Sequence, residues 1–278
     1  MPQDSWPRSL MNRVTHEFRR RLAMLLAKVR LHRVRVDKSG DGKVIAKRRS
    51  FVSPPLVAIG NRYLRLIGAD SEVLRENEWL HWEAIVAPPP TLPHEAASRR
   101  SVSATYNGDT LAAILRSRNR PAPQKLEAVQ LALQALLTLQ QRRVMIDDEE
   151  SWPLSHGDAT ADNVCIDLQN GCATWFDFDT RHRRHLPAHD RHADDLRALL
   201  FSSAALLPCT DFGSLTSLAL SPHISDEVRS ALHRRLHSDW RRPNTFHLAQ
   251  APLPHATCHA FRTTLLQTLG PSTVSRKS

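Results

Sequence analysis

One continuous stretch, residues 154–180, constrains the fold of this chain more than any other, because it joins a polar loop, a hairpin and a second polar segment. It reads LSHGDATADNVCIDLQNGCATWFDFDT. Two short apolar runs flank Asn170-Gly171, a dipeptide that favours a two-residue type I′ turn between antiparallel strands. The predicted hairpin turns the chain back on itself and brings Asp177 beside Asn163.

The polar side chains of this stretch suit phosphoryl transfer from ATP. Asp158 could orient or deprotonate an acceptor hydroxyl, and Asn163 and Asp177 offer the hard oxygen atoms that hold Mg²⁺ against phosphate groups. His156, two residues before Asp158, would brace the loop. A structural alternative is that His156 and Asp158 only cap a buried turn.

The order and spacing of these residues resemble the protein-kinase-like superfamily. His156 and Asp158 are followed by four residues and Asn163, and the triplet that begins at Asp177 comes after the hairpin. The kinase catalytic loop is His-x-Asp-x-x-x-x-Asn, and the metal-binding triplet begins Asp-Phe. Gly157, where protein kinases usually have Arg, is similar to the branch of aminoglycoside phosphotransferases and bacterial lipopolysaccharide kinases. The resemblance implies ATP and Mg²⁺ as cofactors and an alcohol as the phosphoryl acceptor.

The same resemblance implies an α/β (α+β) fold with two lobes. Residues 31–106 would form a small β-rich N-lobe, and residues 107–278 a larger, mostly helical C-lobe that contains the catalytic loop. Residues 1–30 would be a separate basic amphipathic helix. Asp195 would brace the catalytic loop from the large lobe, as in phosphotransferases of this branch.

Hydrophobic periodicity and turn signals predict most of the remaining elements. Alternating residues predict strands at 32–36 and 43–47, and helical spacing predicts a long helix at 124–141. Asp109 is expected to cap a helix at 110–116. Further helices are expected at 193–207, 226–240 and 255–269.

Lys47 is the expected contact to the ATP phosphates. It ends the run Val-Ile-Ala-Lys, which resembles the kinase third-strand motif Val-Ala-Ile-Lys. The chain departs from the protein-kinase pattern here, since no Gly-x-Gly-x-x-Gly precedes this lysine. Gly40 and Gly42 are better interpreted as turn residues of the hairpin.

A helix expected at 72–85 contains the candidates for pairing with Lys47, which are Glu76, Glu78 and Glu83. Asn77-Glu78-Trp79 resembles the Glu-Trp that opens this helix in lipopolysaccharide heptose kinases. The resemblance therefore favours Glu78. The alternative is that each glutamate simply faces solvent.

The charge of the chain favours anionic partners. Lys and Arg number 38 against 28 acidic residues, so the formal net charge is +10, which suits phosphates, a membrane surface or nucleic acid. Residues 10–29 combine a helical apolar stripe with basic residues, and such a helix could lie on an anionic membrane or pack on the protein. No nucleic-acid recognition motif is found, so no nucleic-acid partner is expected.

Without a signal peptide or a run of ~18 apolar residues, the expected location is cytoplasmic, with possible peripheral attachment to the inner face of the membrane.

The acceptor is suggested by the basic run after the metal triplet. Arg181, Arg183 and Arg184 could hold a phosphate or carboxylate on the acceptor, or could be an ordinary charged loop. The predicted function is therefore phosphorylation of a sugar hydroxyl on the lipopolysaccharide core or a similar glycolipid. Alternatives are an aminoglycoside or other small-molecule kinase, which the acidic run 147–150 would suit, a protein Ser/Thr kinase, and a pseudokinase scaffold without turnover.

The four cysteines lie at 165, 172, 209 and 258, without metal-ligand spacing. The two-residue turn would place Cys165 opposite Phe176 rather than Cys172, which argues against a disulfide between them. Reduced core thiols are expected.

Overall fold

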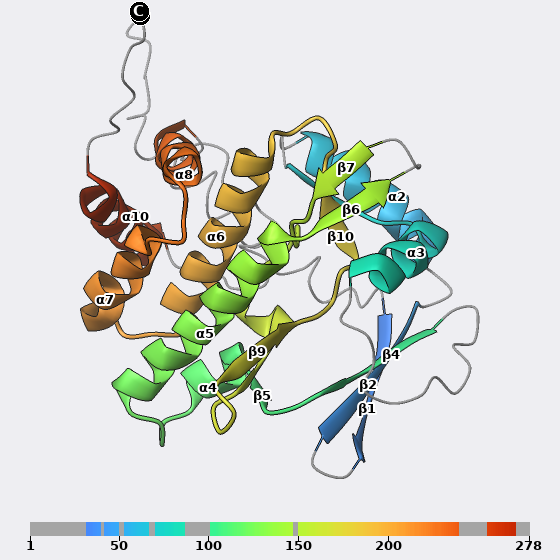
Figure 1. Ribbon diagram of the computed structural model, residues 1–278, viewed down its shortest axis with the longest axis horizontal. Coiled ribbons are helices and arrows are strands. Elements are labelled where there is room, and N and C mark those ends of the chain that lie inside the picture. The colour runs from blue at the N-terminus through green and yellow to red at the C-terminus, as the bar shows by residue number, and fades with distance from the viewer. Residues whose placement is uncertain are drawn as a thin grey trace, which may run out of the picture.

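The computed structural model describes a mixed α+β fold in which helices predominate and the sheets are small (Figure 1). The predicted helix at 10–29 lies outside the part of the chain that is described, as do Asp147, Asp148 and Glu149 of the acidic run. The residues described are 32–39, 42–49, 53–66, 70–86, 101–146, 150–238 and 255–270.

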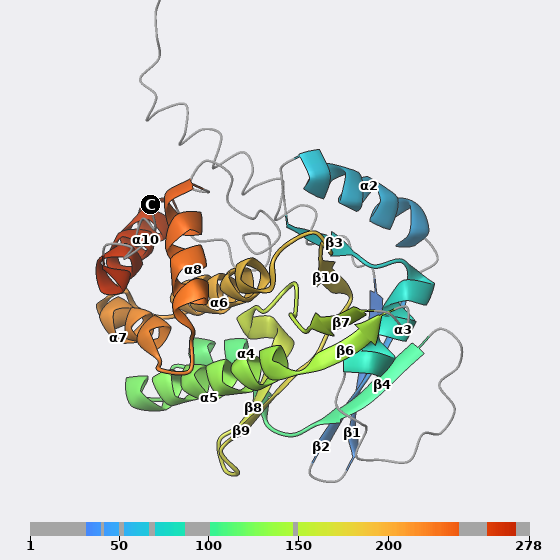
Figure 2. The ribbon, with the colours of Figure 1, turned by 45° about the horizontal axis from the view of Figure 1, so that its top comes forward.

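An antiparallel sheet begins the described chain. Strands β1 (His32–Ser39) and β2 (Gly42–Arg49) form the hairpin that the alternation predicted, and β4 (Ser101–Tyr106) pairs with the other edge of β2, giving the order β1-β2-β4. Both views place this sheet on the opposite side of the molecule from α7 (Phe212–Ser217), α8 (Asp226–Ser238) and α10 (His255–Leu269) (Figures 1 and 2).

The segment between β2 and β4 corrects one prediction. It forms α2 (Ser53–Leu66), a short strand β3 (Ser71–Val73) and α3 (Glu76–Val86), so the helix expected at 72–85 begins later than predicted. Residues of β3 pair instead with β10 (Thr180–His182), and the backbone N–H and C=O of Val73 both bond to the side chain of Asn61. These distant partners satisfy the backbone groups that a longer helix would have used.

The helical part is built around two long helices, α5 (Ala122–Gln141) and α6 (Ala188–Ala204), which cross the centre of the view (Figure 1). Helix α8 packs on α6, and α10 packs on α7 and α8. The predicted helices at 124–141, 193–207, 226–240 and 255–269 are confirmed within a few residues. The other helices are α4 (Leu111–Arg116), α7 (Phe212–Ser217), α8 (Asp226–Ser238), α10 (His255–Leu269) and the short 3-10 turns η1 (Ala161–Asn163), η2 (Cys209–Asp211) and η3 (Leu218–Leu220).

Thr110, rather than Asp109, caps α4. Its Oγ1 accepts a hydrogen bond from the backbone N–H of Ala113, and the pair Asp109–Thr110 forms the short strand β5. The helix was predicted, and its cap was placed one residue too early.

The predicted hairpin at the centre of the chain forms, with a different register. Strands β8 (Val164–Asp167) and β9 (Cys172–Trp175) pair so that Cys165 lies opposite Thr174, not Phe176. The connection is longer than a two-residue turn because the carboxylate of Asp167 accepts hydrogen bonds from the backbone N–H groups of Gln169 and Asn170. Strand β5 pairs with the outer edge of β8. A third hairpin, β6 (Arg143–Ile146) with β7 (Glu150–Pro153), was not predicted.

Helix α5 supports the central hairpin from beneath. The indole Nε1 of Trp175 donates to the carbonyl oxygen of Ala132, and both residues are buried. No helix in the described ranges has the length and apolar character needed to cross a membrane.

All four cysteines are free thiols, but only two of them lie in the core, where all four were expected. Cys165 and Cys258 are buried, whereas Cys172 and Cys209 are exposed. Burial raises the pKa of the Cys258 thiol to about 11.

Candidate functional site

The candidate site is the loop from Ser155 to Asn163, and its shape depends on Gly157. Gly157 has φ +84°, and a Cβ atom at this position would lie 3.0 Å from the Cα of Arg181. A residue with a side chain would therefore be strained by its own backbone and crowded by β10. This explains why glycine follows the histidine in this chain.

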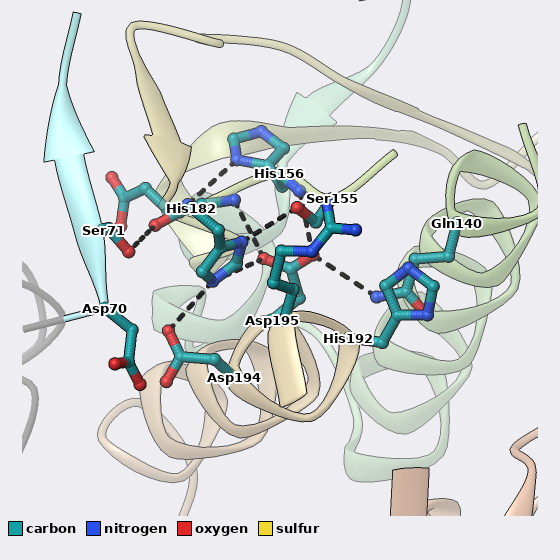
Figure 3. A network of polar contacts seen from close by, with 12 residues as sticks. Asp70, Ser71, Gln140, Ser155, His156, His182, His192, Asp194 and Asp195 are labelled. Carbon is teal, nitrogen blue, oxygen red and sulfur yellow. Dashed lines mark hydrogen bonds and ion pairs between the residues drawn. The ribbon is translucent and has the colours of Figure 1, made fainter. Parts of the chain in front are cut away.

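The side chain of Asp195, on α6, holds the loop through hydrogen bonds to the backbone of the loop (Figure 3). Its Oδ2 accepts from the N–H of His156 at 2.8 Å, and its Oδ1 accepts from the N–H of Gly157 at 2.9 Å. Gln140 Nε2 of α5 donates to the same carboxylate at 3.3 Å. The predicted bracing role of Asp195 is confirmed by these contacts.

His156 joins the loop to the segment after the hairpin. Its Nε2 lies 2.9 Å from the carbonyl oxygen of Phe176, so this nitrogen carries the proton, and its Nδ1 accepts from the N–H of Asp158 at 3.3 Å. The imidazole packs against the rings of Trp175 and Phe178 and is fully buried. Both ring nitrogens are engaged with the backbone, so His156 is a brace, as predicted.

Asn163 fixes the carboxylate of Asp158. The amide Nδ2 of Asn163 donates to the backbone oxygen and to Oδ2 of Asp158, both at 2.9 Å. Both side chains are buried. The Oδ1 atom of Asn163 receives no hydrogen bond from any residue that the structure describes, so this oxygen remains available as a ligand.

Asp177 is held beside Asn163, as the hairpin predicted. The backbone N–H of Phe176 donates to the carbonyl oxygen of Asn163 at 3.0 Å, which joins the end of the hairpin to the end of the loop. Asp177 itself has φ +69° and is the only non-glycine residue with a positive φ in the described ranges.

The oxygen-bearing side chains of Asn163 and Asp177 suit a Mg²⁺ ion chemically. Asn163 Oδ1 and the Asp177 carboxylate are hard ligands of the kind that this cation prefers. Within the described part of the chain, no three His, Cys, Asp or Glu side chains gather as a metal-binding group. A cation here would therefore take few ligands from the protein and the rest from phosphate oxygens and water, which is how Mg²⁺ usually binds at phosphoryl-transfer sites.

Glu83, not Glu78, contacts the backbone of the triplet 177–179. The Oε2 atom of Glu83 accepts from the backbone N–H of Phe178 at 3.2 Å and from the indole Nε1 of Trp79 at 3.1 Å, and the side chain is buried. Glu78 is exposed and accepts from the N–H of Arg75 at 3.1 Å, so it caps the start of α3 away from the site.

Spacing on α3 could have identified Glu83. It lies one helical turn after Trp79, on the face that also carries the buried Trp82 and Val86. Lys47 lies on β2, opposite Val102 of β4, and its side chain is outside the described part of the structure.

The three arginines after the triplet have different environments. Arg181 forms an ion pair across β10 and β3 with Glu72, with Nη2 to Oε1 at 3.0 Å. Arg183 is half-buried, and Arg184 is exposed in the turn that follows. The structure therefore pairs Arg181 with Glu72 across the two strands, whereas Arg183 and Arg184 lie in the segment that follows β10.

Asp162 is a polar residue of the loop that the sequence did not single out. It lies 3.5 Å from Arg116 of α4, and burial raises the pKa of its carboxyl group against the opposing effect of this arginine.

Comparison with known proteins gives this chain no family. No protein-family model, curated protein or solved structure matches it. The chemistry of the site is accordingly argued from its residues and their geometry.

Proposed function

We propose that this protein is an ATP-dependent phosphotransferase that phosphorylates an alcohol. The observation that carries the proposal is the hydrogen bond between Asp158 and Asn163, together with the backbone hydrogen bond that joins the residue before Asp177 to Asn163. Asp158 and Asn163 are hydrogen-bonded to each other inside one loop, and the backbone bond from Phe176 to Asn163 holds Asp177 at the edge of the same site. Phosphoryl transfer requires this combination of a carboxylate for the acceptor hydroxyl and hard ligands for a cation.

Each residue then has a separate task. Asp158 orients the acceptor hydroxyl and takes its proton, and the Asn163 amide keeps the Asp158 carboxylate in one rotamer. Asn163 Oδ1 and Asp177 would hold Mg²⁺, and Lys47 would contact the ATP phosphates. Bound Mg²⁺ would neutralise charge on the phosphate oxygens. His156 keeps the loop and the triplet in register.

We assign to Glu83 the part first given to Glu78. Glu83 reaches the backbone of the triplet, which Glu78 does not. We expect Glu83 to be the carboxylate that orients Lys47, within a two-lobed kinase-like arrangement of residues 31–106 and 107–278. The separation of the β1-β2-β4 sheet from the helices α7, α8 and α10 supports this arrangement (Figure 1).

The test is ATP turnover and its dependence on Asp158. The Asp158→Asn variant should lower kcat by about 10²-fold or more, because general-base contributions are of the order of 10²–10⁴, while the affinity for Mg·ATP is retained. Asp211→Asn, in η2 and outside the candidate loop, is the matched control and should behave as wild type. Equal turnover in Asp158→Asn and wild type would reject the proposal. Nucleotide binding without turnover in the wild-type protein would favour a pseudokinase scaffold.

For the acceptor we propose a sugar hydroxyl on an anionic glycolipid such as the inner core of lipopolysaccharide, with the protein at the cytoplasmic face of the membrane. Support comes from the net charge of +10 and from Arg183 and Arg184, which follow the site directly. A cationic acceptor such as an aminoglycoside, or a protein substrate, is the competing possibility.

Charge reversal separates these acceptors. The double variant Arg183→Glu/Arg184→Glu should raise the acceptor KM steeply for an anionic glycolipid and should lower it or leave it unchanged for a cationic one. Arg118→Glu/Lys125→Glu changes the net charge equally and lies on the helical part near α5, so it serves as the control.

A further inference from the structure

A buried network of charged and polar groups contacts the candidate loop and has no part in the roles assigned above; Figure 3 shows several of its members. It joins α8, α6, β10 and β3. Its centre is Arg235 of α8, whose side chain is only 10% exposed. The other members are Asp70, Ser71, Ser155, His182 and Asp194.

The first path from Arg235 to the loop passes through β3. Nη1 of Arg235 contacts the carboxylate of Asp70, 165 residues earlier in the chain. The next residue, Ser71, donates from its hydroxyl to the carbonyl oxygen of Gly157 at 3.0 Å. Asp70 and Ser71 are adjacent, so Arg235 contacts the chain one residue before the hydroxyl that meets the loop.

The second path passes through α6 and β10. Nη1 of Arg235 also lies 3.4 Å from Oδ1 of Asp194, and Oδ2 of Asp194 accepts from Nε2 of His182 at 3.2 Å. Nδ1 of His182 lies 2.9 Å from the hydroxyl oxygen of Ser155, which precedes His156. The two paths reach the loop on either side of His156.

Ser155, His182 and Asp194 have the residue types of a hydrolytic triad, and their burial argues against that use. Ser155 is 4% exposed, and His182 and Asp194 are each 1% exposed. A nucleophile has to reach a substrate carbonyl, and this hydroxyl does not reach the surface. The contacts of the trio with the loop point to a positioning role.

We propose that Arg235 is a positioning residue for Asp158. The guanidinium of Arg235 contacts the carboxylates of Asp70 and Asp194. The first contact leads to the loop through the adjacent residue Ser71, and the second leads there through the hydrogen bonds of His182 and Ser155. Asp195 holds the two N–H groups of His156 and Gly157, and the Arg235 network holds the opposite side, at the Gly157 carbonyl and the Ser155 hydroxyl. This inference rests on the proposed phosphotransferase function for its catalytic consequence.

Two measurements test it on the full-length protein. Hydrogen exchange of the peptide covering 154–163 reports the loop directly, and steady-state kinetics report kcat and the KM for ATP. The variants are Arg235→Met, Arg235→Lys and Ser71→Ala. The control is Arg234→Met, because Arg234 is the neighbouring and more exposed arginine of α8, paired with Asp190 at 3.5 Å.

Arg235→Met should speed exchange in 154–163 and lower kcat by about 10–100-fold with little change in the KM for ATP, because a shift of about 1 Å in a reacting group can cost 10²-fold. Arg235→Lys should restore part of the exchange protection and part of kcat, and Arg234→Met should match wild type.

Unchanged exchange in Arg235→Met, or equal effects of Arg234→Met, would overturn the proposal. If Arg235→Met does not fold, Arg235→Lys and Ser71→Ala decide, since wild-type exchange in both would also overturn it. A wild-type protein without turnover would reject the proposed function, and the exchange data would still decide the role of Arg235.

Discussion

Asp177 adopts a backbone conformation that few side chains tolerate. Its φ of +69° lies in the left-handed region, where Asn and Asp are favoured over other non-glycine residues. An alanine at this position would add about 1–2 kcal/mol of backbone strain to the loss of the carboxylate. Asparagine is therefore the substitution that changes the charge and leaves the backbone unstrained.

The Asp177→Asn variant should lose most of its affinity for Mg·ATP, because it removes a charged ligand from the proposed cation site. Its free energy of unfolding should stay close to that of wild type. Isothermal titration calorimetry with and without Mg²⁺ measures the affinity, and Asp226→Asn, at the exposed start of α8, is the control. Equal Mg·ATP affinity in Asp177→Asn and wild type would remove Asp177 from the site.

Glu83 and Glu78 have opposite environments on one helix, and alanine substitutions should separate them. Glu83→Ala leaves two buried N–H donors, of Phe178 and Trp79, without their acceptor, which should lower the free energy of unfolding by about 1–3 kcal/mol. Glu78→Ala removes one exposed contact to Arg75 and should cost less than about 1 kcal/mol. Urea denaturation followed by circular dichroism measures both. A larger loss in Glu78→Ala would contradict the assignment of Glu83.

At the scale of single elements, α6 determines the course of the chain before the candidate loop. Arg191 Nη1 donates to the carbonyl oxygen of Pro153 at 2.9 Å, and His192 Nε2 donates to that of Leu154 at 2.9 Å. Asp195 then holds the two amides that follow. One helix therefore binds two residues just before the loop, Pro153 and Leu154, and two residues within it, His156 and Gly157, so the stability of the helix and that of the loop are coupled.

This coupling predicts a dependence of stability on pH. Burial lowers the pKa of His192 below its ordinary value of 6.5. The unfolded chain binds this proton more readily, so the contribution of neutral His192 to stability is present above pH 6.5 and is lost as the pH falls below it. His192→Gln keeps an N–H donor for Leu154 and does not titrate.

The free energy of unfolding of wild type should therefore fall between about pH 7 and 5 more steeply than that of His192→Gln, by up to about 1.4 kcal/mol per pH unit. Urea denaturation at several pH values measures the slopes. His223→Gln, which changes an exposed histidine, should keep the wild-type slope. If the free energies of unfolding of wild type and His192→Gln change in parallel with pH, His192 has the same pKa in the folded and the unfolded chain, and the prediction is wrong.

For the whole molecule, the net charge of +10 and the basic residues 10–29 predict reversible binding to anionic bilayers. Each Lys or Arg near such a surface contributes about 1 kcal/mol of attraction, and the apolar stripe of the segment would add hydrophobic insertion. Deletion of residues 1–30 should abolish co-sedimentation with vesicles that contain anionic lipid, while neutral vesicles bind neither form. A folded deletion variant that still binds anionic vesicles would assign the segment to packing on the protein.

Sequence reasoning succeeded where the signal is local. The period-two alternation of β1 and β2, the helical spacing of α5 and α10, and the turn residues between β8 and β9 all act over a few residues. These local patterns predicted the bounds of the elements to within a few residues of those observed. The hairpin signal also predicted that the chain would return to Asn163, and the backbone of Phe176, the residue before Asp177, does bond to Asn163.

What the sequence by itself determined about this protein is thus the order of its main elements and the residues of its central loop. Tertiary structure decided the rest. Residues 71–73 became a strand because β10, 109 positions later, supplies their hydrogen-bond partners. Glu83 rather than Glu78 reached the triplet because the buried face of α3 lies against it. Arg235 met Asp70 across 165 residues of chain. Such contacts depend on groups far apart in sequence that come together only when the whole chain folds, and no local pattern encodes them.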